Sequence, residues 1–244
     1  MRDIDNVDIV ISSIYYEEIA KQLNSMGINN FKVFNFLLQD CPTKGTEAKE
    51  SREYNIRFLD LGAFLSSIHS DIRIEDMTFL AGGSGLLDCI FLKAVMIKLG
   101  LKTYLEIGTW MGESIVAVSE VAEKCYSISL PDDDKKVVDY FKDILNKSNF
   151  SRYFSRGREN IVHFYGDSKT FDFSIIKDKV DLVFIDGDHS YEGVRKDTEN
   201  IFNFVDIENT IVVWHDFKDI RNKFIEPTVQ AIFDALPANL HNKI

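Results

Sequence analysis

A ten-residue stretch near the middle of the chain combines a carboxylate, two glycines and a hydroxyl at spacings suited to binding a small molecule. It reads LEIGTWMGES over residues 105–114, where an apolar run ends and a helical pattern begins. Ligands of open α/β sheets bind at the carboxyl ends of strands, and Gly108 and Gly112 let the backbone turn close to a ligand. Glu106 could pair with an ammonium group, while Ser114 and the helix N-terminus could hold a carboxylate. An ordinary strand–turn–helix connection remains the alternative.

Two later stretches place acids and histidines directly after apolar runs. Residues 184–194 read FIDGDHSYEGV, and residues 212–217 read VVWHDF. Because the carboxyl ends of parallel strands share one edge of a sheet, side chains from both stretches are expected near the glycine loop. The alternative is structural, since Asp186 or Asp188 could cap a helix that begins near Tyr191.

The elements that would position these residues alternate regularly from residue 103 onward. Continuous β-branched runs indicate strands covered on both faces, and the strand–helix alternation predicts a parallel sheet with right-handed crossovers. The predicted strands are Thr103–Gly108, Lys124–Leu130, Ile161–Tyr165, Val180–Asp186 and Thr210–Trp214, and the predicted helices are Ser84–Leu99 (capped by Ser84), Glu113–Ala122, Asp132–Lys147, Tyr191–Phe204 and Phe224–Leu236.

Together the three stretches resemble class I S-adenosylmethionine-dependent methyltransferases, in the version found in metal-dependent O-methyltransferases of the catechol and macrolide-sugar type. LEIGTWMGES is similar to their first motif, FIDGDHSYEGV to their fourth-strand signature and VVWHDF to the end of their fifth strand. The resemblance covers roughly residues 84–236 and implies an α/β, doubly wound, mostly parallel Rossmann-like sheet. The dinucleotide pattern GxGxxG is not matched, because Trp110 replaces its middle glycine, which disfavours a nicotinamide-dependent oxidoreductase.

The resemblance implies a role for each matching position. Asp186 and Asp216, with the adjoining His215, match positions that bind a divalent cation, and oxygen ligands suit Mg²⁺. His189 matches the base of the sugar-modifying members, and Asp167 matches the position near the adenine amino group. The implied contacts to S-adenosylmethionine are Glu106, Gly108, Thr109, Trp110, Gly112, Ser114, Ser129, Asp167 and Asp186. Purely structural roles remain as alternatives for several of them: Trp110 and His215 could be packed rings, His189 a surface histidine and Asp167 a turn residue.

One departure concerns the second strand of the predicted sheet. In the enzymes that this chain resembles, this strand usually ends in an acid that binds both ribose hydroxyls, but Ser129 stands there. A serine cannot make the paired acceptor contact of a carboxylate, so Asp132 from the following turn is the expected substitute. If nothing substitutes, either the affinity for the cofactor is weakened or the site is vestigial. The whole interpretation requires a crevice across the strand ends with room for a nucleoside.

The implied reaction is attack of a substrate oxygen on the sulfonium methyl group. A metal would lower the pKa of the hydroxyl and His189 would take its proton. The expected substrate is a small molecule, and the family resemblance implies a sugar hydroxyl as the acceptor. Two rivals stay open: a related metal-dependent enzyme of the cephalosporin-hydroxylase type, and a non-catalytic module that binds the cofactor or a partner protein.

Composition narrows the class of protein. The formal net charge of −11 repels a phosphate backbone, so we expect no nucleic-acid partner. No apolar stretch is long enough for a membrane span, the start lacks the order of a signal peptide, and three widely spaced cysteines fit a reducing compartment, so we expect a cytoplasmic protein.

The chain is predicted to contain two parts. Residues 84–244 form the methyltransferase domain. The chain ends at residues 240–244 just as another strand would begin, so either the sequence stops short of the usual last strand or the sheet lacks it. Residues 1–83 form an accessory segment with a strand–helix–strand unit at Asp8–Ser12, Tyr15–Met26 and Phe31–Phe36, and a linker at Cys41–Tyr54. This segment is expected to be a lid or the contact of a homodimer.

Overall fold

The computed structural model describes residues 9–11, 31–33, 60–78, 83–145, 150–218 and 223–243. The chain divides into two units, one of residues 1–53 with 218–224 and the other of residues 54–217 with 225–244. All of the strand-end residues proposed as site residues belong to the second, larger unit. Within the described part of the chain, no helix combines the length and apolar character needed to cross a bilayer.

The smaller unit contains two short strands, β1 (Ile9–Ile11) and β2 (Phe31–Val33), which pair in parallel. Both lie within predicted strands. Parallel strands need a crossover between them, as the predicted strand–helix–strand unit has. The predicted helix Tyr15–Met26 and the predicted linker Cys41–Tyr54 lie outside the described residues.

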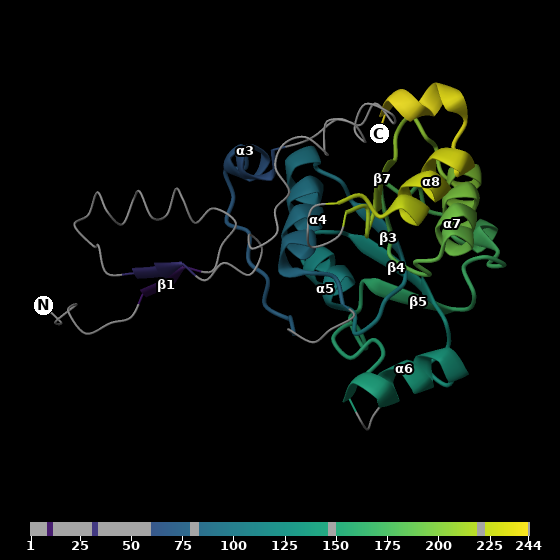
Figure 1. The fold of residues 1–244 in the computed structure, drawn as a ribbon, viewed down its shortest axis with the longest axis horizontal. Coiled ribbons are helices and arrows are strands. Elements are labelled where there is room, and N and C mark those ends of the chain that lie inside the picture. Colours follow the sequence, from purple (N-terminus) through teal and green to yellow (C-terminus); the bar gives the residue numbers. More distant parts are fainter. Residues whose placement is uncertain are drawn as a thin grey trace, which may run out of the picture. The chain divides into compact units, whose positions relative to one another are not determined.

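The larger unit is built on a five-stranded parallel sheet (Figure 1), with the strand order β5-β4-β3-β6-β7. The strands are β3 (Thr103–Ile107), β4 (Lys124–Ser129), β5 (Ile161–Tyr165), β6 (Leu182–Ile185) and β7 (Ile211–Trp214). The chain starts in the middle at β3, runs outward to β5 and returns to β6 on the other side of β3. This reversal between β3 and β6 is the switch point at which open α/β sheets bind ligands.

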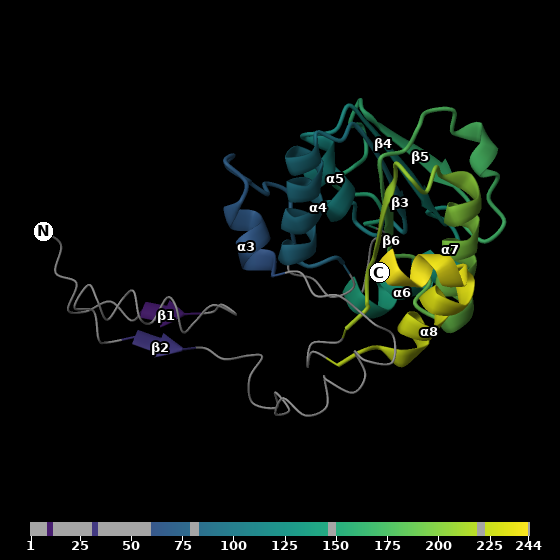
Figure 2. The ribbon, with the colours of Figure 1, turned by 90° about the horizontal axis from the view of Figure 1, so that it is seen from above.

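Helices cover both faces of the sheet (Figure 2), as the predicted doubly wound architecture requires. On one face, Tyr104 of β3 packs in a core with α4 (Leu86–Leu99) and α5 (Glu113–Ser119). On the other face, Leu105 and Ile107 of the same strand pack with Ile201 of α7 (Tyr191–Phe204). Alternate residues of β3 therefore serve two cores, which explains why its sequence is an unbroken buried run.

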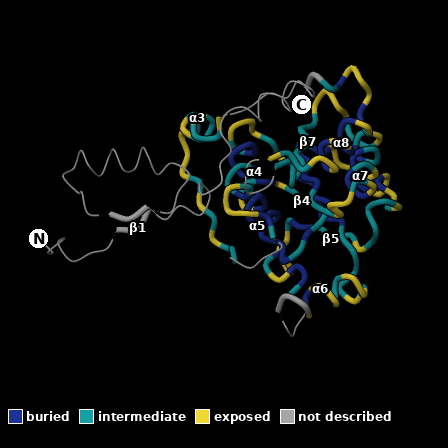
Figure 3. Tube along the Cα trace, viewed as in Figure 1, coloured by how far each residue is buried: buried dark blue, intermediate teal, exposed yellow. Residues whose placement is uncertain are grey.

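The remaining elements complete the outer layer. Within the described chain, the residues drawn in dark blue, which are buried, lie in the central strands and on the inner sides of the helices (Figure 3). Helix α8 packs against α7 through a core that contains Val194 and Ile232. These elements are α3 (Leu61–Ser66), α6 (Lys135–Leu145), the 3₁₀ helix η2 (Phe173–Ile175), α7 (Tyr191–Phe204), α8 (Glu226–Ala235) and the 3₁₀ helix η3 (Ala238–Lys243).

Three local predictions were wrong. The N-cap of α4 is Gly85, not Ser84, because the Asp88 carboxylate accepts the backbone N–H of Gly85 at 2.7 Å. Helix α6 begins at Lys135 rather than at Asp132, after a turn in which Asp134 accepts a backbone N–H. The C-terminal residues, expected to start a strand, form η3 instead.

Candidate cofactor and metal site

The glycine loop after β3 lies directly against the end of β6. Gly108 has a φ of +89°, and a Cβ there would lie 1.9 Å from the backbone oxygen of Asp186. Gly112 has a φ of +86°, and a Cβ there would lie 2.4 Å from the Ser155 hydroxyl. Glycine is therefore required at both positions for conformation and for close approach. The loop is held between two other segments, which is more than an ordinary strand–turn–helix connection needs.

Glu106 lies at the floor of this loop and is fully buried on the α4–α5 face of the sheet. Its Oε2 accepts hydrogen bonds from the Ser114 hydroxyl at 2.8 Å and the Tyr104 hydroxyl at 3.1 Å, whereas Oε1 has no partner. Burial raises the pKa of Glu106 well above its usual range. A buried carboxylate oxygen without a partner suits a cation such as the ammonium group predicted there.

Trp110 behaves as a packed aromatic in this structure. Its ring stacks on Phe141 of α6, with centroids 4.1 Å apart and planes 8° from parallel, and also contacts the ring of Tyr140 edge-on. The indole Nε1 is buried and has no hydrogen-bond partner. The ring therefore packs α6 against the glycine loop, and its indole N–H is left as a donor for a ligand.

A pocket of about 30 Å³ lies between the glycine loop and the end of β6. This volume holds one or two water molecules and no nucleoside. The lining residues are Ser84, Gly108, Thr109, Trp110, Glu113, Ser114, Asp186 and His189. Glu113 was not predicted as a site residue; its carboxylate accepts the backbone N–H of Thr78 at 2.7 Å and so ties the segment before α4 to the loop.

The second group of predicted residues gathers at the ends of β6 and β7. Ligand atoms of Asp186, His215 and Asp216 all lie within 4.8 Å of one another, as a metal ion would require. His215 Nδ1 is 3.0 Å from Asp186 Oδ1 and 3.2 Å from Asp216 Oδ1. His189 Nδ1 lies 2.6 Å from Oδ2, the other carboxylate oxygen of Asp216. The helix-cap reading of Asp186 is wrong, because Ser190 is the N-cap of α7.

Electrostatics tie these side chains together. Burial lowers the pKa of His215, but hydrogen bonds to Asp186, Asp216 and Asp88 outweigh it and raise that pKa to about 12. Hydrogen bonds from His189 and His215 hold the pKa of Asp216 well below its usual range. Two carboxylates and an imidazole are a donor set that fits a divalent cation.

Two residues near this cluster were missed by sequence reasoning. The Ser84 hydroxyl donates to Asp186 Oδ2 at 2.8 Å, and Asp88 Oδ2 lies 3.3 Å from His215 Nε2. Both come from the start of α4, which is far from the motifs in sequence. The pattern of the chain gives no signal for either contact, because it depends on how α4 packs across the sheet.

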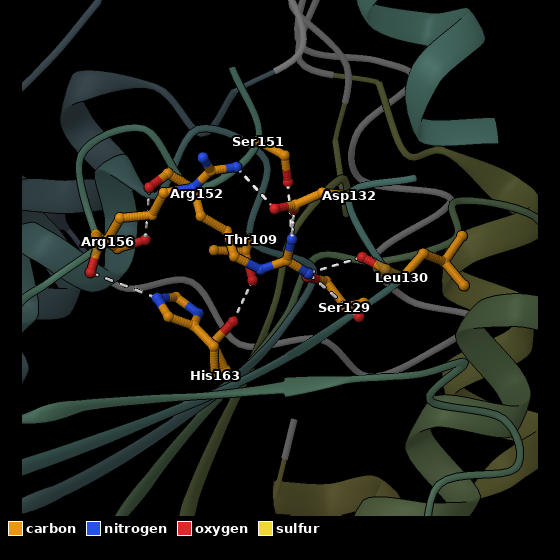
Figure 4. A network of polar contacts seen from close by, with 10 residues as sticks. Thr109, Ser129, Leu130, Asp132, Ser151, Arg152, Arg156 and His163 are labelled. Carbon is orange, nitrogen blue, oxygen red and sulfur yellow. Dashed lines mark hydrogen bonds and ion pairs between the residues drawn. The ribbon is translucent and has the colours of Figure 1, made fainter. Parts of the chain in front are cut away.

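The end of β4, where the sequence predicts that a nucleoside binds, is occupied by the side chain of Arg152. Ser129 ends β4 as predicted, and the guanidinium of Arg152 lies against it and against Asp132 (Figure 4). Asp167, predicted near the adenine, accepts the backbone N–H of Lys169 at 3.0 Å, as a turn residue does. Arg152 therefore lies where the ribose of the predicted nucleoside would bind, and the crevice with room for a nucleoside stays a prediction.

Backbone strain concentrates at these strand ends. Among the described residues, the non-glycine residues with a left-handed backbone are Trp110 at φ 49°, Arg152 at φ 57° and Asp216 at φ 53°. Such conformations cost on the order of 1–3 kcal/mol each and persist where the surrounding structure imposes them. Trp110 belongs to the glycine loop, Arg152 places its side chain at the end of β4, and Asp216 belongs to the acidic cluster.

Comparison with protein families identifies the class. Residues 105–217, just under half of the chain, match the model of a family described as a methyltransferase domain. The match runs from the glycine loop to the acidic cluster. This stretch of the chain is therefore similar to a methyltransferase domain. No curated protein matches the sequence.

Several solved structures are similar to this chain. The methyltransferase PaMTH1 of Podospora anserina with bound SAH is 14% identical over 73% of each chain, at a TM-score of 0.42. A provisionally assigned O-methyltransferase from Klebsiella pneumoniae is 14% identical over 77% of this chain and 80% of its own, at 0.44. A TehB-like SAM-dependent methyltransferase from Corynebacterium glutamicum is 16% identical over 64% and 75%, at 0.40. Likenesses at this level support neither a substrate nor a mechanism.

Proposed function

We propose that this chain transfers the methyl group of S-adenosylmethionine to a hydroxyl oxygen of a small molecule, with a sugar hydroxyl as the expected acceptor. The observation that carries the proposal is the position of the Asp186, His215 and Asp216 side chains beside the glycine loop of a methyltransferase domain. A substrate oxygen near the acids and a methyl donor on the loop would lie next to each other at the switch point of the sheet.

The amino-acid end of the cofactor is assigned to the β3 side of the site. Its ammonium group would meet Glu106, whose Oε1 has no partner, and its carboxylate would meet the N-terminal end of α5 at Ser114. When bound, the cofactor supplies a methyl group already activated by the positive sulfonium. The protein then has to position the two reactants, which is the main source of rate enhancement for such a transfer.

Proton removal is assigned to His189. Its Nδ1 is bonded to Asp216, which orients the ring and leaves Nε2 to take the proton of the substrate hydroxyl. A divalent cation held by Asp186, His215 and Asp216 would lower the pKa of that hydroxyl. Asp216 can contact both the cation and His189, because one of its carboxylate oxygens faces His215 and the other faces His189.

A second candidate function is a non-catalytic module of the same family. It is favoured by two observations, the side chain of Arg152 at the end of β4 and the small volume of about 30 Å³ of the pocket beside the glycine loop. In that case the chain would bind a partner protein or a smaller ligand at this pocket.

A transfer assay tests the proposed function. The protein is incubated with methyl-labelled S-adenosylmethionine, Mg²⁺ and a panel of catechols and sugar-hydroxyl compounds, and products are weighed by mass spectrometry. We expect a product heavier by one methylene unit, and loss of that product in EDTA. A gain of one oxygen would assign the hydroxylase-type chemistry instead, and full activity in EDTA would exclude the metal role. No product from any acceptor would favour the non-catalytic candidate.

A further inference from the structure

Arg152 is a fully buried arginine whose side chain crosses the predicted nucleoside site. Its NH1 donates to Asp132 and to the Ser151 hydroxyl, and its NH2 donates to the hydroxyl of Ser129 and to the carbonyl of Leu130 at 2.7 Å. The guanidinium also lies over the ring of Tyr165 at 4.5 Å. In Figure 4 it is enclosed between Asp132 and the end of β4.

The backbone around Arg152 is fixed to the cofactor loop. The Arg152 N–H donates to the carbonyl of Trp110 at 2.7 Å, and the Phe154 N–H donates to the carbonyl of Met111 at 3.0 Å. From this attachment, the side chain reaches the end of β4. It therefore spans from the loop after β3 to the strand end where the ribose of a nucleotide cofactor binds in doubly wound folds.

The donors of Arg152 are engaged in a way that does not suit an anion-binding arginine. Two nitrogens are satisfied by protein oxygens, and the third, Nε, is buried without a partner. An arginine that waits for a phosphate or carboxylate ligand presents a fork of donors to solvent. The groups that Arg152 covers are instead acceptors, the Ser129 hydroxyl and the Asp132 carboxylate, and ribose hydroxyls need acceptors of this kind.

Asp132 has the properties needed to change partners. Its side chain is one-third exposed, and its Oδ2 is bonded to Arg156 at 2.7 Å while its Oδ1 is bonded to Arg152. If Arg152 leaves, Arg156 still neutralises the carboxylate. The full penalty of an unpaired buried charge is therefore avoided.

We propose that Asp132 is the ribose-binding carboxylate of this chain and that Arg152 occupies it until the cofactor arrives, so that cofactor binding displaces the Arg152 side chain. This inference rests on the proposed function, because it takes S-adenosylmethionine as the ligand. It assigns a residue for the acceptor role that Ser129 cannot fill. It also accounts for the position of the Arg152 side chain at the end of β4.

Calorimetric titration with S-adenosylhomocysteine tests the proposal in the full-length chain. Arg152→Met removes the competing guanidinium, and we expect the Kd to fall at least fivefold. Adding Asp132→Asn to Arg152→Met removes the ribose acceptor, and we expect the Kd to rise at least tenfold relative to Arg152→Met alone. The matched control is Arg158→Met, which removes the same charge from a surface pair with Asp76 and is expected to bind within twofold of the wild type.

The outcomes separate the two proposals. If wild type binds S-adenosylhomocysteine and Arg152→Met binds equally or more weakly, the displacement proposal is overturned while the proposed function stands. If neither binds at millimolar ligand, both are overturned. Should Arg152→Met not fold, as judged by circular dichroism, Arg152→Lys serves instead, because an ammonium cannot reproduce the fork to Asp132 and β4. A Kd for Arg152→Lys no lower than that of wild type would then overturn the proposal.

Discussion

The two sides of the crevice at the strand ends are organised differently. On the β6–β7 side, Asp186, His215 and Asp216 converge with their ligand atoms within 4.8 Å and a small pocket beside them. On the β4 side, Arg152 and Asp132 neutralise each other and fill the space. The side chains on the β6–β7 side already converge, whereas the proposed nucleoside site on the β4 side requires displacement of the Arg152 side chain.

The same contrast separates what the sequence could and could not reveal. The unbroken apolar runs predicted the five parallel strands, and strand ends in one sheet must meet at one edge, so the meeting of Asp186 with Asp216 followed from topology. Arg152 lies in a turn that carries no motif. Its place in the crevice depends on a left-handed backbone at an arginine, which no residue preference signals.

The largest effect is expected on the reactive side, from His189→Ala. Loss of a general base typically lowers turnover by about 10²–10⁴-fold. Because His189 lies outside the nucleoside side, the Kd for S-adenosylhomocysteine should stay within threefold of wild type. Steady-state rates with the acceptor found in the transfer assay measure this change.

The matched control is His69→Ala, which alters an exposed histidine of the segment before α4. Its turnover is expected to equal that of wild type. Turnover of His189→Ala equal to wild type would remove the assignment of this residue as the base and would leave the β6–β7 side with a binding role alone.

A smaller effect, on stability rather than rate, is expected at Asp197, a carboxylate on the β6 side that is not paired with an arginine as Asp132 is. Asp197 of α7 is fully buried beneath the loop after β6, and burial raises its pKa to about 6. A raised folded-state pKa stabilises the fold below the unfolded value near 3.8, and that contribution is lost as the pH rises through about 6. Asp132, by contrast, is neutralised by arginines on the β4 side.

We therefore expect Asp197→Asn to gain stability relative to wild type as the pH is raised from 4 to 7. A shift of roughly two pKa units corresponds to about 2–3 kcal/mol in the free energy of unfolding. Urea unfolding followed by circular dichroism at each pH measures the difference, with the exposed Asp139→Asn as control. A pH-independent difference between Asp197→Asn and wild type would show that Asp197 titrates normally.

The most direct test of the account is the affinity of wild type and Glu106→Gln for S-adenosylhomocysteine, with Glu208→Gln, an exposed position after α7, as control. A hydrogen bond to a charged group contributes about 1.5–3 kcal/mol, so loss of the carboxylate charge beneath the glycine loop should raise the Kd by about 10–100-fold. The account predicts saturable one-to-one binding to wild type and to Glu208→Gln, and this weakening in Glu106→Gln. Absence of saturable binding to wild type, or equal affinity in Glu106→Gln, would contradict it.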